Sequence, residues 1–169
     1  LQAIGNVSHQ AERFLMVGQR WDVAIEQPWD FDAPNWEANI RSHVQKQGGL
    51  HPKTGIDYFV FPRGLYDTVP PFAIGRTAWD NWLIHYARRR SAIVVDATES
   101  VTAVHQDHDY GKFASKDRLW TGEEARLNQR LMGGDYSTLD HASHLLSPQG
   151  LRYAWTPGEL LRHPRRLMG

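Results

Sequence analysis

The sequence predicts an α/β fold in which a mixed sheet is flanked by helices. Two observations support this prediction. Apolar segments rich in β-branched and aromatic residues, at 14–25, 56–61 and 91–96, are typical of buried strands. Segments of helical length that open with capping residues lie between them, at 36–47 and 78–89. Because strands and helices alternate and 169 residues is about the size of one domain, we expect a single α/β domain.

The first two predicted elements are a core strand and a helix. The strand is expected to be interrupted near Gly18, because glycine weakens a strand interior. Asn35 belongs to the residue types that cap helix N-termini, so we expect a helix over residues 36–47. The glycine pair Gly48 and Gly49 then ends this helix.

The central part of the chain predicts two further strands around a second helix. Residues 56–61 are almost continuously apolar and are followed by Pro62, which indicates a central strand. Thr77 can cap a helix over residues 78–89. Residues 91–96 then predict another buried strand.

The last third of the chain is expected to be less regular. Residues 101–104 continue as extended chain. Thr121 and Glu124 have the spacing of a capping box, which predicts a helix that ends at a glycine pair. Residues 145–169 read as a less regular tail, with one short helix after Pro157.

Composition excludes several classes of partner. The chain has 19 basic and 19 acidic residues, so we expect no electrostatic binding of nucleic acid or anionic membranes. It has no cysteine, which excludes disulfides and thiolate metal sites. No apolar run reaches the roughly 18 residues needed to cross a membrane, and we expect a cytoplasmic protein. Because the chain opens at Leu1 rather than Met, we expect a longer parent protein.

A carboxylate stands at the start of the apolar segment 56–61. A charge in this position needs a partner, a cap or a function, because burial without a partner is costly. We interpret Asp57 as a candidate for binding a polar substrate. The alternative is that Asp57 accepts hydrogen bonds from backbone amides of the preceding turn.

The start of the second helix combines a carboxylate, an amide and two indoles. Indole faces suit the stacking of sugar rings, and Asp80 can take a proton from an acceptor hydroxyl. Asp80 is therefore the candidate catalytic base, and the candidate acceptor-binding residues beside it are Arg76, Trp79, Asn81 and Trp82. The alternative is that Asp80 complements the helix dipole while both indoles lie in the core.

A cluster of histidine and aspartate follows the extended segment 101–104. His105, Asp107 and His108 can bring imidazole and carboxylate ligands to one divalent cation, which favours manganese or magnesium. The alternative is a hydrogen-bonded polar loop. Asp30 and Asp32 also form a carboxylate pair, but they lie in a loop rather than at a strand end, so we interpret that pair as a chance match.

Several segments, taken in order, resemble a family of glycosyltransferase-like proteins of the GT-A type, the nucleotide-diphospho-sugar transferases. They are GIDYFVFPR at 55–63, PPFAIGR at 70–76, WDNW at 79–82, VDAT at 95–98 and HQDHDY at 105–110. The later segments 120–128 and 139–142 also fit, so the resemblance spans most of the chain.

The resemblance implies that residues 1–169 form the C-terminal, acceptor-side part of a GT-A-like domain. Its nucleotide-binding strands and metal-binding carboxylate pair would then lie before Leu1. The resemblance gives Asp80 the place of the acidic residue that deprotonates or orients the acceptor, and His105 or His108 the place of a late metal ligand. The implied function is metal-assisted transfer from a nucleotide-sugar donor to a carbohydrate or other hydroxyl acceptor.

Two other functions compete with this hypothesis. The first is a non-catalytic carbohydrate-binding or scaffold domain, in which Trp79 and Trp82 stack on sugars without a donor. It predicts sugar binding that needs neither metal nor nucleotide. The second is a metal-dependent hydrolase that uses His105, Asp107 and His108 as ligands. It predicts tight metal binding and turnover of phosphate esters.

Overall fold

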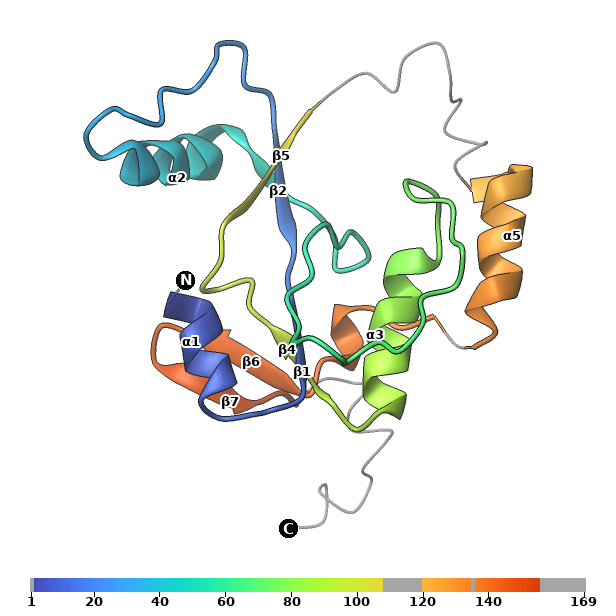
Figure 1. The fold of residues 1–169 in the computed structure, drawn as a ribbon. Coiled ribbons are helices and arrows are strands. Elements are labelled where there is room, and N and C mark those ends of the chain that lie inside the picture. The colour runs from blue at the N-terminus through green and yellow to red at the C-terminus, as the bar shows by residue number, and fades with distance from the viewer. Residues whose placement is uncertain (1, 108–119, 135, 156–169) are drawn as a thin grey trace.

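The computed structural model describes residues 2–107, 120–134 and 136–155 (Figure 1). Its helices are α1 (Gln2–Ser8), α2 (Trp36–Gln47), α3 (Trp79–Arg89), α5 (Glu123–Met132) and the 3-10 helix η2 (Leu139–His141). Its strands are β1 (Phe14–Val17), β2 (Arg20–Val23), β3 (Gly49–Leu50), β4 (Ile93–Asp96), β5 (Ala103–Gln106), β6 (His144–Ser147) and β7 (Gly150–Tyr153). The fold is thus α/β with mixed sheets flanked by helices, which confirms the predicted class.

The larger sheet has the strand order β1-β4-β6-β7. Strands β1, β4 and β6 run parallel, and β7 returns antiparallel to β6. In the register of the first pair, Leu15 lies opposite Val94 and Val17 opposite Asp96. Burial on both faces explains why β1 and most of β4 are apolar without alternation.

A smaller sheet has the order β3-β2-β5, in which β2 runs parallel to β5 and antiparallel to β3. Only Gly18 and Gln19 separate β1 from β2, so the chain passes directly from one sheet into the other (Figure 1). The predicted interruption near Gly18 is therefore confirmed. Glycine is needed there because a Cβ atom at this position would collide with the Tyr58 hydroxyl.

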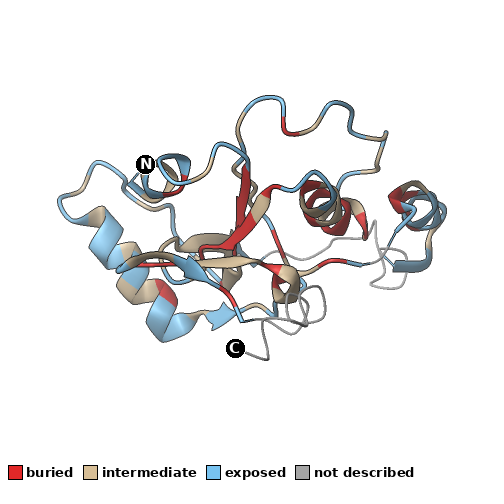
Figure 2. Cartoon of the chain, turned by 90° about the horizontal axis from the view of Figure 1, so that it is seen from below, coloured by how far each residue is buried: buried red, intermediate tan, exposed pale blue. Residues whose placement is uncertain are grey.

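Alternate side chains of β1 face opposite layers of the core. Leu15 and Val17 pack in one cluster with Ile84 of α3. Met16 packs in a second cluster with Val7 of α1. This two-residue period places the larger sheet between α3 and α1, and the buried residues gather along the central strands and on α3 (Figure 2).

Residues 56–61 do not form the predicted central strand. Instead, Ile56 and Val60 make isolated antiparallel bridges to Gln19 and Met16. The Met16 amide donates to the Val60 carbonyl at 2.8 Å, and the Val60 amide donates back at 2.9 Å. A continuous ladder does not form because the neighbouring chain changes sheets between these two bridges.

The helices lie where the sequence predicts them, but their caps differ. Asn35 precedes α2 with φ of 62° and makes no side-chain cap bond. Ala78, with φ of 82°, occupies the cap position of α3, so Thr77 lies one residue outside it. The predicted capping box of Thr121 does not form, because α5 begins only after Gly122.

The region beyond residue 145 is more regular than predicted. Strands β6 and β7 form an antiparallel hairpin that completes the larger sheet. Helix α1 is likewise a structural element that the sequence pattern did not indicate. Residues 156–169, with the helix predicted after Pro157, lie outside the described residues. Among the described residues, no helix is long and apolar enough to cross a membrane.

Candidate functional site

Arg20 on β2 joins two carboxylates that are distant in sequence. Its Nη1 atom donates to both carboxylate oxygens of Asp57, at 2.8 and 2.7 Å. Its Nε atom donates to Oδ1 of Asp22 at 2.7 Å. The Arg20 side chain is only 14% exposed, so these charge-assisted bonds fix its orientation.

Strand geometry explains why these groups meet. Arg20 and Asp22 are two residues apart on β2 and therefore point to the same face. The parallel register places Asp22 beside His105 of β5. The bridge between Gln19 and Ile56 brings the following residue, Asp57, next to the start of β2.

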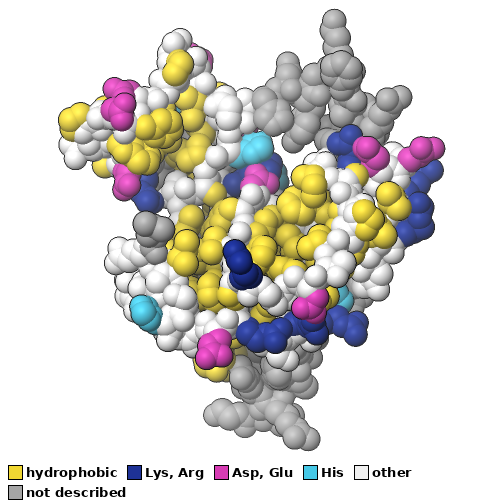
Figure 3. Space-filling view, viewed as in Figure 1, with side chains coloured by type: hydrophobic (Ala, Val, Ile, Leu, Met, Phe, Trp, Pro, Cys, Tyr) yellow, Lys and Arg dark blue, Asp and Glu magenta, His cyan; other side chains and the backbone are white. Residues whose placement is uncertain are grey.

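Two histidines complete this group of charges. Nδ1 of His51 donates to Oδ2 of Asp22 at 2.5 Å. Nδ1 of His105 lies 3.0 Å from Oδ2 of Asp57. We call the five residues Arg20, Asp22, His51, Asp57 and His105 the Arg20 cluster. Figure 3 shows basic, acidic and histidine side chains meeting beside a hydrophobic area, in the region where β2 and β5 lie.

The contacts of Arg20 and Asp22 stabilise the charged forms of these two residues. Burial of the guanidinium opposes its charge, but hydrogen bonds and charges of Asp57 and Asp22 outweigh burial and raise the pKa of Arg20. Burial likewise opposes the charge of Asp22, whereas hydrogen bonds from His51 and Arg20 hold the pKa of this carboxyl below its ordinary value. Arg20 and Asp22 are therefore both held in their charged forms at neutral pH.

Asp80 lies in the first turn of α3 and differs from the cluster carboxylates. Its Oδ1 atom is buried and has no hydrogen-bond partner among the described residues. Burial raises the pKa of Asp80 to about 6, backbone amides of the first turn partly offset the rise, and the charge of Asp57 adds to it. The effect of Asp57 links Asp80 electrostatically to the Arg20 cluster.

The two indoles around Asp80 have different environments. Trp79 is half-buried and packs against Phe59, with ring centroids 5.3 Å apart. Trp82 is 6% exposed and lies in the core among three other aromatic rings. Asn81 is also buried, and its amide donates to the carbonyl of Ser137 at 2.9 Å. Of the predicted acceptor contacts on this helix, the structure therefore leaves Trp79 accessible and places Asn81 and Trp82 in the interior.

Arg76 is held by another helix. Its Nε atom donates to Oε2 of Glu124 on α5 at 2.7 Å. In the described part of the chain, the hydrogen bonds of Arg76 go to Glu124 and to the carbonyl of Gly75. The structure does not bring Arg76 into the Arg20 cluster.

The predicted metal ligands are only partly described. His105 belongs to the Arg20 cluster, whereas Asp107 is exposed and its backbone amide donates to the carbonyl of Val23. His108 lies outside the described residues. Within residues 2–107, 120–134 and 136–155, no three histidine or acidic side chains are grouped to bind a metal ion.

The other carboxylate pair lies in an exposed loop. Oδ1 of Asp30 accepts a hydrogen bond from the backbone amide of Asp32 at 3.0 Å. This is a turn in which an aspartate side chain bonds the backbone two residues on. The local contact is consistent with the interpretation of this pair as a chance match.

Sequence reasoning identified Asp57, Asp80 and His105 but missed Arg20 and Asp22, as well as the accompanying His51. A signal for the two missed β2 residues was present, because a base and an acid two residues apart on one strand must share a face. Their partners come from separate segments, so only the strand register reveals them.

Comparison of the chain with protein-family models, curated proteins and solved structures finds no match in any of the three.

Proposed function

We propose that this chain supplies the acceptor site for metal-assisted glycosyl transfer from a nucleotide sugar to a hydroxyl group, with Asp80 as the general base. The observation that supports this proposal best is the unpartnered, buried Oδ1 atom of Asp80. A buried polar atom without a partner is unfavourable unless a ligand or reaction uses it.

In the proposed reaction, Asp80 removes a proton from the acceptor hydroxyl as that hydroxyl attacks the donor sugar. Oδ1 of Asp80 accepts the proton of the acceptor hydroxyl, whose oxygen then bonds to the anomeric carbon of the donor. The bond from that carbon to the diphosphate oxygen breaks, and the nucleoside diphosphate leaves with the electron pair. With a pKa of about 6, Asp80 is ionised at pH 7 yet remains a stronger base than an ordinary carboxylate.

Asp57 and Trp79 are the proposed positioning residues for the acceptor. The guanidinium of Arg20 holds both oxygens of Asp57, so the direction of this carboxylate is fixed before a ligand arrives. Carboxylate oxygens can accept further hydrogen bonds from acceptor hydroxyls. The accessible part of the Trp79 indole offers a surface for a sugar ring.

The divalent cation, manganese or magnesium, stays a prediction. Two of its three predicted ligands, His105 and Asp107, are described, and the third, His108, is not. When bound, the cation would neutralise charge on the leaving diphosphate. Donor binding by this chain also stays a prediction, as does the alternative of a non-catalytic sugar-binding domain or a hydrolase.

The direct test is release of nucleoside diphosphate from a panel of nucleotide sugars with manganese and simple sugar acceptors. Asp80→Asn is expected to lower kcat at least about 100-fold, since the base is lost. The matched control is Asp140→Asn, which changes an exposed carboxylate paired with Lys53. Equal turnover by Asp80→Asn and the control would exclude Asp80 as the base. Absence of sugar-dependent release in the wild-type chain, with phosphate-ester turnover instead, would favour the hydrolase.

A further inference from the structure

A hollow lies beside helix α2, which Figure 1 shows on the far side of β2 and β5 from α3. It has a volume of about 580 Å³ and lies between α2 and the segment at residues 24–30. Its lining is Ala24, Ile25, Glu26, Gln27, Pro28, Trp29, Asp30, His43 and Gln47. None of these residues belongs to the Arg20 cluster or to the predicted acceptor site.

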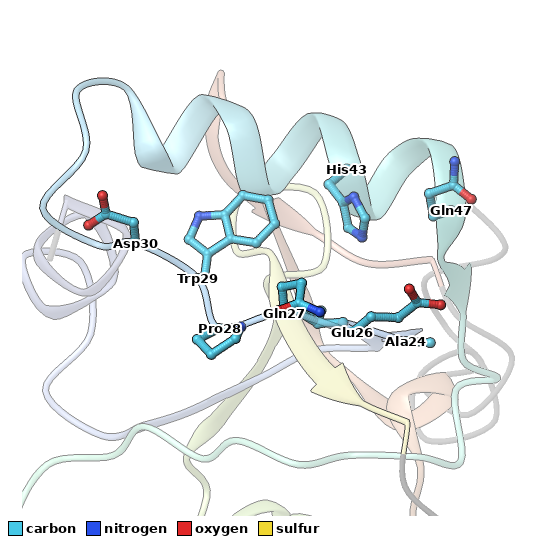
Figure 4. A pocket seen from close by; sticks show the side chains of 9 residues that line it. Ala24, Glu26, Gln27, Pro28, Trp29, Asp30, His43 and Gln47 are labelled. Carbon is cyan, nitrogen blue, oxygen red and sulfur yellow. The ribbon is translucent and has the colours of Figure 1, made fainter.

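The fold holds the walls of this hollow in place. The backbone amide of Ile25 donates to Oε1 of Gln106 at 3.0 Å, which ties the 24–30 segment to β5. Val44 of α2 is completely buried and anchors the helix above it. On one wall of the hollow, the rings of Trp29 and His43 are in contact, with centroids 5.5 Å apart and an interplanar angle of 59° (Figure 4).

His43 provides the polar group that points to a ligand. Its Nε2 atom is buried and has no hydrogen-bond partner in the described part of the chain. Figure 4 shows the imidazole projecting from α2 into the space bounded by Trp29, Gln27 and Glu26. A hydroxyl group both donates and accepts, so it can satisfy this nitrogen in either neutral tautomer.

The charged and polar residues that line the hollow indicate which class of ligand it can bind. Among the described residues, no lysine or arginine lines the hollow, which disfavours phosphates and nucleotides. Of the two lining carboxylates, Asp30 already accepts a bond from the amide of Asp32 and points away from the centre (Figure 4). Glu26 is thus the one carboxylate lying along the floor, with the Gln47 amide at the same end. An indole with a few amide, carboxylate and imidazole groups suits a neutral polyhydroxylated ring.

We propose that this hollow binds a neutral saccharide, with one sugar ring against the Trp29 indole and one hydroxyl hydrogen-bonded to Nε2 of His43. Glu26 and Gln47 accept or donate to further hydroxyls at the opposite end. The site is separate from the proposed transfer site, so the proposal does not depend on transferase activity.

The test is calorimetric titration of the chain with glucose, galactose, mannose and N-acetylglucosamine, with choline and a sugar phosphate as comparators. His43→Leu and Trp29→Ala are each expected to raise the Kd for the best sugar roughly tenfold. The control variant Trp155→Ala removes an indole that is 64% exposed and outside the hollow, and it should leave the Kd unchanged.

A second readout separates lost binding from lost folding. His43→Leu removes a buried polar atom that has no partner, so the melting temperature of the free protein should rise while sugar affinity falls. The proposal is wrong if no neutral sugar gives a saturable titration, or if sugar binding survives in both variants. Tighter binding of choline than of any sugar would assign the hollow to a cation and also overturn it. Asp80→Asn should leave sugar binding here intact, whatever its effect on transfer.

Discussion

Replacing Asp80 with asparagine should make the protein more stable at neutral pH and change how stability depends on pH. The ionised carboxylate is buried at the start of α3 with one unpartnered oxygen, so folding removes it from water with incomplete compensation. Asparagine keeps the shape of the side chain but carries no charge. The variant therefore isolates the contribution of ionisation.

The size of the pH-dependent stability change follows from the shift in the pKa of Asp80 from 3.8 to about 6. This shift corresponds to about 3 kcal/mol of unfolding free energy. Between these two values the folded protein binds more protons than the unfolded chain. The contribution of Asp80 to stability is therefore most favourable below pH 3.8, falls as the pH rises to about 6, and is constant above it. The stability of Asp80→Asn relative to wild type should increase by up to about 3 kcal/mol over this window.

The assay is urea unfolding of both proteins at pH values from 4 to 8, with the difference in unfolding free energy plotted against pH. Effects common to both proteins cancel in this difference, and a pH-independent penalty of the new amide shifts the difference without changing its slope. Asp140→Asn serves as the control for a carboxylate-to-amide change at an exposed position. A difference between wild type and Asp80→Asn that does not vary with pH would refute the claim that burial perturbs Asp80.

Four further predictions concern the residues around the junction of the two sheets. Tyr58→Phe removes a buried hydroxyl without a described partner, so the unfolding free energy should rise by about 1 kcal/mol in urea titrations, and a decrease would contradict this reading. Gly18→Ala should lower the unfolding free energy by about 1–3 kcal/mol, because the new methyl group would collide with the Tyr58 hydroxyl. Combining the two changes should recover part of that loss, whereas strict additivity would argue against the contact. Asp22→Asn should destabilise the protein at pH 7, because the lowered pKa of Asp22 contributes stability above about pH 3.8. This destabilisation should shrink as Asp22 of the wild type is protonated in acid, and a loss that persists unchanged there would contradict the prediction.

Helices that are followed directly by glycine in the sequence could be predicted with nearly correct bounds. Helix α2 has the predicted bounds, and α5 ends at Gly133, whose φ of 57° is the left-handed conformation that glycine favours. The segment 56–61 could not be predicted in the same way. Its apolar composition indicates burial, but its pairing depends on where the neighbouring chain changes sheets, which is a tertiary property.

The same distinction between local sequence signals and tertiary pairing applies to the candidate site. Asp57 and Asp80 stood out because each is a charge in an apolar context, and both have specific electrostatic surroundings in the structure. The amphipathic pattern of α3 did not reveal that Trp82 faces the core while Trp79 is half-buried. Arg20 was missed because its importance comes from partners 2 and 37 residues away that only strand pairing assembles.

The charge of Asp57, a member of the Arg20 cluster, affects the pKa of Asp80, the proposed base. A lone charge on Asp57 would oppose ionisation of Asp80 more strongly than a charge paired with a guanidinium, because the field of an ion pair falls off faster with distance. Arg20 binds both oxygens of Asp57 and so weakens its repulsion of Asp80. We infer that this pairing helps to keep the pKa of Asp80 near 6, low enough for the carboxylate to be ionised at pH 7.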